Sequence, residues 1–116
     1  MPPRNPDLRL RDIVEAIDRI LDYTSAQTFA SFAADRKTVD AVVRNLEVLG
    51  EAARHIDADT VGRLPNVPWR DMADLRNLLI HEYFGISLDI VWATIERDLR
   101  PLRKAVLDAL SADDKE

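Results

Sequence analysis

The 116-residue chain has no cysteine, only three glycines and no long hydrophobic run. Without thiols it can form neither disulfides nor thiolate metal sites, and a reducing cytoplasm is the expected compartment. No apolar stretch approaches the roughly 18 residues of a membrane span, and the opening segment lacks the apolar core of a signal peptide. Basic residues are the minority, with 16 Lys and Arg against 21 Asp and Glu, so the formal net charge is −5. A nucleic-acid site would therefore need a local arginine cluster, a dimer seam that joins two clusters, or a partner.

Apolar residues spaced three and four apart dominate the pattern and predict amphipathic helices. The composition, 47% hydrophobic and 32% charged, is that of a soluble globular chain. Four long helices are expected: one capped by Asp7 that frays near residues 23–25, one capped by Asp35 that runs to about Ile56, one with Pro68 at its first position that runs from Trp69 to about Phe84, and one capped by Ser87 that continues to Leu110. Pro101 is expected to kink or break the last helix near residues 97–100.

The segments between these helices are predicted to be short. Phe29 and Phe32 are expected to anchor the first link on the core, and residues 57–67 are expected to hold one short helical turn ending at Gly62, followed by a loop. The length suits one hydrophobic core and not two. We therefore predict a single domain over residues 1–116, with flexible ends at 1–6 and 111–116. Its predicted fold is an all-α antiparallel bundle of four to five helices with a kinked or broken last helix.

Small residues surround a carboxylate inside the second expected helix, at Gly50, Glu51, Ala52 and Ala53. A glycine inside a helix costs about 1 kcal/mol relative to alanine, so its presence indicates the close approach of another backbone. Two interpretations stay open: packing against another helix of the same chain, and the lining of a cleft or dimer seam. Glu51 could reach a facing arginine, and Arg76 is the arginine considered. His55 is interpreted as structural, without an acid–base role, because the helix dipole favours a histidine there.

Reactive side chains are densest in R-N-L-L-I-H-E-Y, residues 76–83. Arg76 supplies a permanent cation, Asn77 an amide, His81 an imidazole and Tyr83 a phenol. In a regular helix His81 lies about 140° round from Arg76, so the two converge on one atom only if the helix end loosens, the long arginine side chain reaches round, or a second chain takes part. No spacing typical of metal ligands is present. On spacing alone, a catalytic R-x4-H and an ordinary histidine at the edge of the core both stay open.

Residues 76–83 can be compared with what the cleavage of RNA without a metal requires. The reaction needs a base for the 2′-hydroxyl proton, an acid for the leaving 5′-oxygen and a cation on the charged phosphorane between them. One chain supplies one such histidine and one such arginine in this stretch, His81 and Arg76. A twofold dimer supplies two of each, so acid and base could both be histidines.

The run R-N-L-L-I-H-E-Y-F-G-I-S-L-D-I-V-W-A-T-I-E-R-D-L-R-P-L resembles the signature half of the HepT-like branch of the HEPN superfamily. Two upstream segments, V-P-W-R-D-M-A-D-L and L-G-E-A-A, are similar to the same family's pattern, so the resemblance covers most of residues 8–103. It implies a small, all-helical, dimeric toxin that is encoded beside a minimal nucleotidyltransferase antitoxin, in a type VII-like toxin–antitoxin pair.

The resemblance implies functions for individual residues. Arg76 and His81 match the family's R-x4-H ribonuclease motif, with Arg76 as phosphate binder and His81 as general acid or base. Asn77 would orient the site or the phosphate, and Glu51 would support it. Tyr83 matches the tyrosine that the nucleotidyltransferase adenylylates with ATP, and the chain itself would use no cofactor. The implied protein is a cytoplasmic, metal-independent endoribonuclease; the alternative is a non-catalytic helical binding partner or scaffold of the nucleotidyltransferase.

Overall fold

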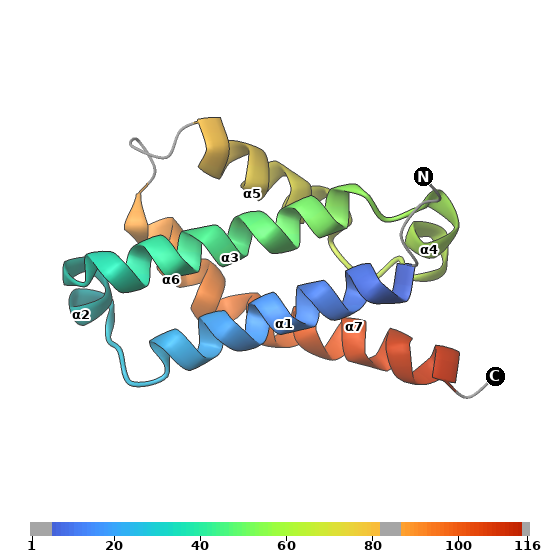
Figure 1. Ribbon diagram of the computed structural model, residues 1–116, viewed down its shortest axis with the longest axis horizontal. Helices are drawn as coiled ribbons and strands as arrows, with labels where there is room; N and C mark the ends of the chain where they lie inside the picture. The colour runs from blue at the N-terminus through green and yellow to red at the C-terminus, as the bar shows by residue number, and fades with distance from the viewer. Residues whose placement is uncertain (1–5, 82–86, 115–116) are drawn as a thin grey trace.

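The computed structural model describes residues 6–81 and 87–114 of the chain (Figure 1). Within these ranges the regular structure is helical, and no strand occurs. The helices are α1 Pro6–Thr24, α2 Phe29–Ala34, α3 Arg36–Arg54, α4 Ala58–Arg63, α5 Trp69–His81, α6 Leu88–Arg97 and α7 Leu99–Asp114. The predicted all-α class is confirmed. Two short helices lie between long ones: α2 between α1 and α3, and α4 between α3 and α5.

The long helices pack around α3. This helix lies between α1 and α5 and runs antiparallel to both, whereas α7 packs on α1 and α6 on α7 (Figure 1). The apolar stripes predicted from the sequence face one another in this arrangement. The largest fully buried side chains are Leu10, Ile13, Ile17, Ile20, Phe32, Val42, Leu46, Leu49, Leu79, Val91, Leu99 and Val106.

The caps at the helix starts follow the sequence in part. Asp35 caps α3 by accepting a hydrogen bond from the backbone N–H of Thr38, and Ser87 caps α6 in the same way, as predicted. The prediction that Asp7 is a cap was wrong, because α1 already includes Pro6, which has no N–H to leave unpaired at a helix start. Asp7 lies in the first turn instead, where the negative charge of its carboxylate interacts favourably with the positive end of the helix dipole.

The first link forms the short helix α2, which the sequence analysis treated only as a connection. Phe32 is fully buried, and its ring centroid lies 5.1 Å from that of Trp92, so this anchor is confirmed. The same expectation for Phe29 holds in part: Phe29 is 38% exposed, but its ring centroid lies 6.4 Å from that of Trp92, which packs against the core. A reciprocal capping box between Thr28 and Ser31 begins the helix.

The ends of the later elements differ from the prediction by small steps. α3 ends at Arg54 with His55 as its C-cap, and the expected turn after it is α4, which extends one residue past Gly62. Pro68 directly precedes α5 and does not occupy its first position. The expected end of that helix at Phe84 lies outside the described residues.

The last helix is broken where the sequence predicted a kink or break. α6 ends at Arg97 and α7 begins at Leu99, with Asp98 between them. Pro101 falls in the first turn of α7, where its missing N–H and its ring prevent a continuous helix from α6. α7 continues to Asp114, so residues 111–114, which were assigned to a tail, are helical.

Candidate functional site

The side chain of Arg76 starts from a point where α5 crosses close to α3. A Cβ added to Gly50 of α3 would lie 2.3 Å from the Cβ of Arg76 and 2.8 Å from the carbonyl oxygen of Met72. Gly50 does not have a positive φ, so this glycine is required for space and not for its backbone conformation. The close approach predicted at Gly50 is confirmed, and the approaching backbone belongs to the same chain.

The Arg76 guanidinium is held on two sides. Its Nε lies 3.0 Å from Oε2 of Glu51, and its Nη1 donates a hydrogen bond of 3.1 Å to Oδ1 of Asn77. The Glu51 oxygen is shielded from solvent and receives no directed hydrogen bond, so its contact with Arg76 is a close ionic attraction. The Arg76 side chain keeps 20% of its surface exposed, and Nη2 has no partner among the described residues.

Glu51 has a second partner on its own helix. Oε1 of Glu51 lies 2.7 Å from Nε2 of His55. The pKa of Glu51 lies below its ordinary value, first because of the hydrogen bond from His55 and to a smaller extent because of the nearby charge of Arg76. Since an ionised carboxylate can only accept, the proton in this contact lies on Nε2 of His55.

A pocket of about 270 Å³ opens beside Arg76, at the surface shared by α1, α3 and α5. We call it the arginine pocket; it is lined by Arg9, Asp12, Arg44, Glu47, Val48, Glu51, Ala52 and Arg76. Arg44 makes only a loose ion pair of 3.8 Å with Glu47, and its side chain is 74% exposed. The pocket groups three arginines in one place, but three carboxylates accompany them, so its formal charge is balanced and an anion would be bound by directed contacts with an arginine.

The sequence analysis did not single out Arg9 and Arg44. Arg44 and Glu51 are seven residues apart on one helix, so helical periodicity could have placed both on one face. Arg9 comes from α1, and its place in the pocket depends on how α1 packs on α3, which no local spacing reveals.

The other motif residues are described less fully. His81 is the last residue of α5, so it shares a helix with Arg76 and lies about 140° round from it in regular geometry. The structure describes no side chain for His81. Tyr83, the expected site of modification, lies outside the described residues. Arg76, Asn77 and Glu51 are therefore the predicted site residues whose side chains the structure brings together.

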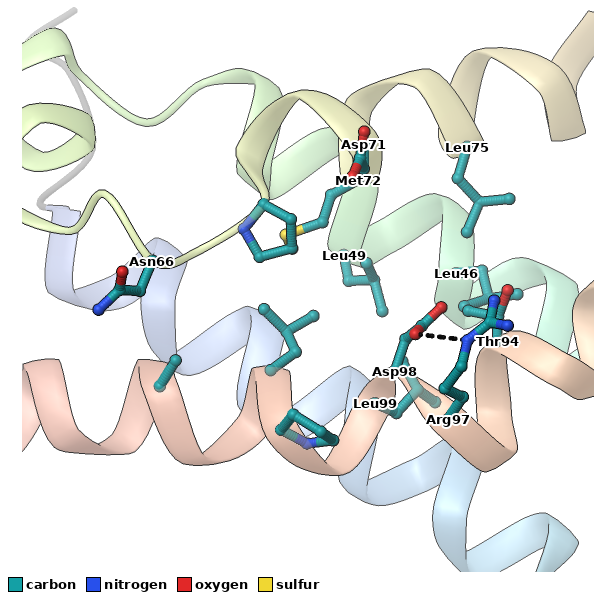
Figure 2. A pocket seen from close by; sticks show the side chains of 14 residues that line it. Leu46, Leu49, Asn66, Asp71, Met72, Leu75, Thr94, Arg97, Asp98 and Leu99 are labelled. Atoms are coloured by element: carbon teal, nitrogen blue, oxygen red, sulfur yellow. Dashed lines mark hydrogen bonds and ion pairs between the residues drawn. The ribbon is translucent and has the colours of Figure 1, made fainter.

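A larger pocket lies on another side of α5 and does not include Arg76. We call it the apolar groove; it has a volume of about 620 Å³ and runs between α5 and the α6–α7 pair. Figure 2 shows Met72 and Leu75 of α5 facing Leu99 across it, with Leu46 and Leu49 of α3 behind. Three ionic residues line it: Arg97 and Asp98, which are paired with each other, and Asp71. The arginine pocket is the better candidate for chemistry, because it contains the motif arginine and a carboxylate that orients it.

The described residues contain neither a metal-binding cluster nor a helix able to span a membrane. Residues 6–81 and 87–114 include no group of three or more His, Asp or Glu side chains able to hold a metal ion. No helix in these ranges combines the length and apolar character that crossing a membrane requires.

The described residues form a small all-α bundle in which one helix, α5, carries Arg76 and His81 at the R-x4-H spacing, as the resemblance to HEPN-like helical proteins implies. The chain matches the family described as "Ribonuclease HepT-like" over residues 13–109. It is 43% identical over 94 residues to "Probable ribonuclease HepT" of Thermococcus cleftensis, covering 81% of this chain and 86% of that protein. It is also 38% identical over 118 residues to "Putative RNase MJ0127" of Methanocaldococcus jannaschii, covering 98% of each. The chain therefore belongs to the HepT-like ribonuclease family. No solved structure matches it.

Proposed function

We propose that this chain is the toxin of a type VII-like toxin–antitoxin pair, a metal-independent endoribonuclease that acts in the cytoplasm as a homodimer. The observation that carries the proposal is the arrangement of Arg76. Glu51 and Asn77 hold two parts of its guanidinium, while Nη2 is left without a partner among the described residues. A guanidinium fixed at Nε and Nη1, whose Nη2 is contacted by none of the described residues, suits a phosphate, and relatives named as ribonucleases support RNA as the phosphate's source.

In the proposed reaction two histidines transfer protons and Arg76 stabilises negative charge. A histidine takes the proton from the 2′-hydroxyl as its oxygen attacks phosphorus, and a second histidine protonates the 5′-oxygen as the bond from phosphorus to that oxygen breaks. The products are a 2′,3′-cyclic phosphate and a 5′-hydroxyl end. Arg76 stabilises the negative charge that builds up on the phosphorane oxygens.

The homodimer follows from the need for two proton-transfer groups. The motif contains one histidine, His81, so a twofold axis beside α5 would supply the second from another copy. Such a dimer would also bring the arginines of two arginine pockets to one cleft, although the three carboxylates of each pocket balance its three arginines in formal charge. RNA would lie across the joint cleft.

Neutralisation is proposed to act through Tyr83. The phenol oxygen attacks the α-phosphorus of ATP in the active site of a cognate nucleotidyltransferase, pyrophosphate leaves, and the phenol proton goes to solvent or a base. The attached nucleotide places an anionic phosphodiester within the reach of Arg76 and occupies the RNA cleft.

The test compares induced expression in cells with cleavage of RNA by the purified proteins. Arg76→Ala is expected to lower the rate of RNA cleavage about 10²- to 10³-fold, as removal of one transition-state contact does, and His81→Ala is expected to abolish growth arrest. Arg70→Ala is the matched control, because Arg70 is an exposed arginine of the same helix outside the arginine pocket. Cleavage should persist with EDTA present.

The partner is tested by co-expression. A cognate nucleotidyltransferase should rescue cells that express the wild type but not cells that express Tyr83→Phe, which should stay toxic. If His81→Ala arrests growth as strongly as the wild type, or if purified wild type leaves RNA intact, the chain is a non-catalytic helical partner of the nucleotidyltransferase and the nuclease proposal is wrong.

A further inference from the structure

His55 lies at the C-cap of α3, one helical turn after Glu51, and its side chain is 43% exposed. No sequence pattern links it with Arg76, because it lies 21 positions before that residue. In the fold the two are connected by a single carboxylate. Oε1 of Glu51 contacts His55 at 2.7 Å, and Oε2 of Glu51 contacts Arg76 at 3.0 Å.

The two ends of this carboxylate are held differently. Oε2, on the Arg76 side, has no directed hydrogen bond, so ionic attraction alone draws it towards the guanidinium. Oε1 makes the short contact with His55. A glutamate side chain has three rotatable bonds, and a free one populates several rotamers. The contact with His55 therefore adds to the attraction of Arg76 in holding the rotamer in which Oε2 faces Arg76.

We infer that His55 is a positioning residue of the ribonuclease site: it fixes Glu51, and Glu51 fixes the Nε side of Arg76 so that Nη2 stays directed to the phosphate. His55 itself touches neither the RNA nor the reacting atoms. The catalytic consequence rests on the proposed function, whereas the positioning of Arg76 does not.

A positioning residue and an ordinary structural contact differ in what their removal changes. Exposed pairs four residues apart on a helix contribute little to stability, so loss of His55 should leave the fold and its stability nearly unchanged. The orientation of Arg76 should change instead. A freed Arg76 still attracts a phosphate, so the Michaelis constant should stay the same, but the arginine is less well placed for the transition state, so kcat should fall.

The first experiment measures Arg76 directly by NMR, as the order parameter and solvent exchange of its Nε–Hε group, assigned by its loss in Arg76→Lys. All proteins carry His81→Ala so that they can be produced without growth arrest. His55→Ala should lower the order parameter of Arg76 and speed its exchange. His55→Gln should behave like the parent, because the glutamine amide can donate to Glu51 from nearly the position of Nε2. Arg36→Ala is the matched control, since Arg36 pairs with Asp40 four residues on in the same helix, with both side chains exposed.

The second experiment measures RNA cleavage with the intact motif. His55→Ala should lower kcat about three- to tenfold with KM within about twofold of wild type, and His55→Gln should restore kcat. An unchanged Arg76 signal in His55→Ala, or an equal change in Arg36→Ala, would overturn the positioning role whatever the protein catalyses. A rise in KM at constant kcat would overturn it as well. If the Arg76 signal responds as expected but the wild type does not cleave RNA, the positioning stands and the proposed function fails.

Discussion

The two sides of α5 differ in how they are filled. Towards α3 the helices meet so closely that one residue must be glycine, at Gly50. We call this contact, made by Gly50, Glu51, Met72 and Arg76, the α3–α5 seam. Towards α6 and α7, the same helix borders the apolar groove of about 620 Å³ (Figure 2). The comparison teaches that α5 is positioned mainly by its contact with α3. The residues of the α3–α5 seam therefore determine where Arg76 lies.

The largest effect on stability and on RNA cleavage is expected from a substitution at Gly50, where the seam leaves no space for a side chain. Gly50→Ala adds a methyl group 2.3 Å from the Cβ of Arg76 and 2.8 Å from a backbone oxygen, and neither atom is the far end of a flexible side chain. α5 must therefore move. Overpacking of this kind costs about 1–3 kcal/mol, and alanine's better helix propensity offsets only about 1 kcal/mol. RNA cleavage should fall at least as far as in Arg76→Lys, because Arg76 moves with its helix.

Gly62→Ala is the control for this substitution. Gly62 also lies in a helix, α4, but nothing lies within 4 Å of the position of its added Cβ. Alanine there should stabilise the fold by up to about 1 kcal/mol. Urea unfolding of the three proteins at one fixed concentration tests both expectations. Equal effects of the two substitutions would mean that the seam is not tight in solution.

A larger side chain should be tolerated in the apolar groove, whereas even one added methyl group is not tolerated in the α3–α5 seam. Ala105 of α7 lines the apolar groove and is partly buried, and leucine has nearly the helix propensity of alanine. Ala105→Leu therefore adds apolar carbons to the wall of the groove, and it should raise the free energy of unfolding by up to about 1 kcal/mol. The same urea titration measures it. A loss comparable to that of Gly50→Ala would show that the groove is closed or occupied in solution.

The close approach of two helices in the seam could be predicted from the sequence, whereas the apolar groove could not, and the reason is physical. Glycine in a helix indicates a close neighbour, and Pro101 indicates a break, because each residue type has one dominant steric consequence. The volume of the groove depends on the tilt of α5 relative to α7, to which many side chains contribute. The function assigned to His55 was missed for a similar reason: a histidine four residues after a glutamate is ordinary, and its meaning comes from the second oxygen of Glu51, which reaches another helix.

The smallest predicted effect concerns the charge of Glu51 in the seam. The hydrogen bond from His55 and the charge of Arg76 lower the pKa of Glu51 below its ordinary value of 4.5. A carboxyl group with a lowered pKa in the folded state stabilises the fold above its unfolded pKa, and this contribution is lost as the pH falls through the folded pKa. Glu51→Gln should thus cost a few tenths of a kcal/mol at neutral pH, since the side chain is 42% exposed and solvent screens it.

The pH dependence of that difference identifies the group that titrates. Urea unfolding of wild type and Glu51→Gln should give a difference that persists from neutral pH down to about 5 and disappears only below 4.5, the ordinary value. A difference that vanishes already between neutral pH and about 6 would assign the titration to another group, and the ionised Glu51 would then not be what holds Arg76 in the seam.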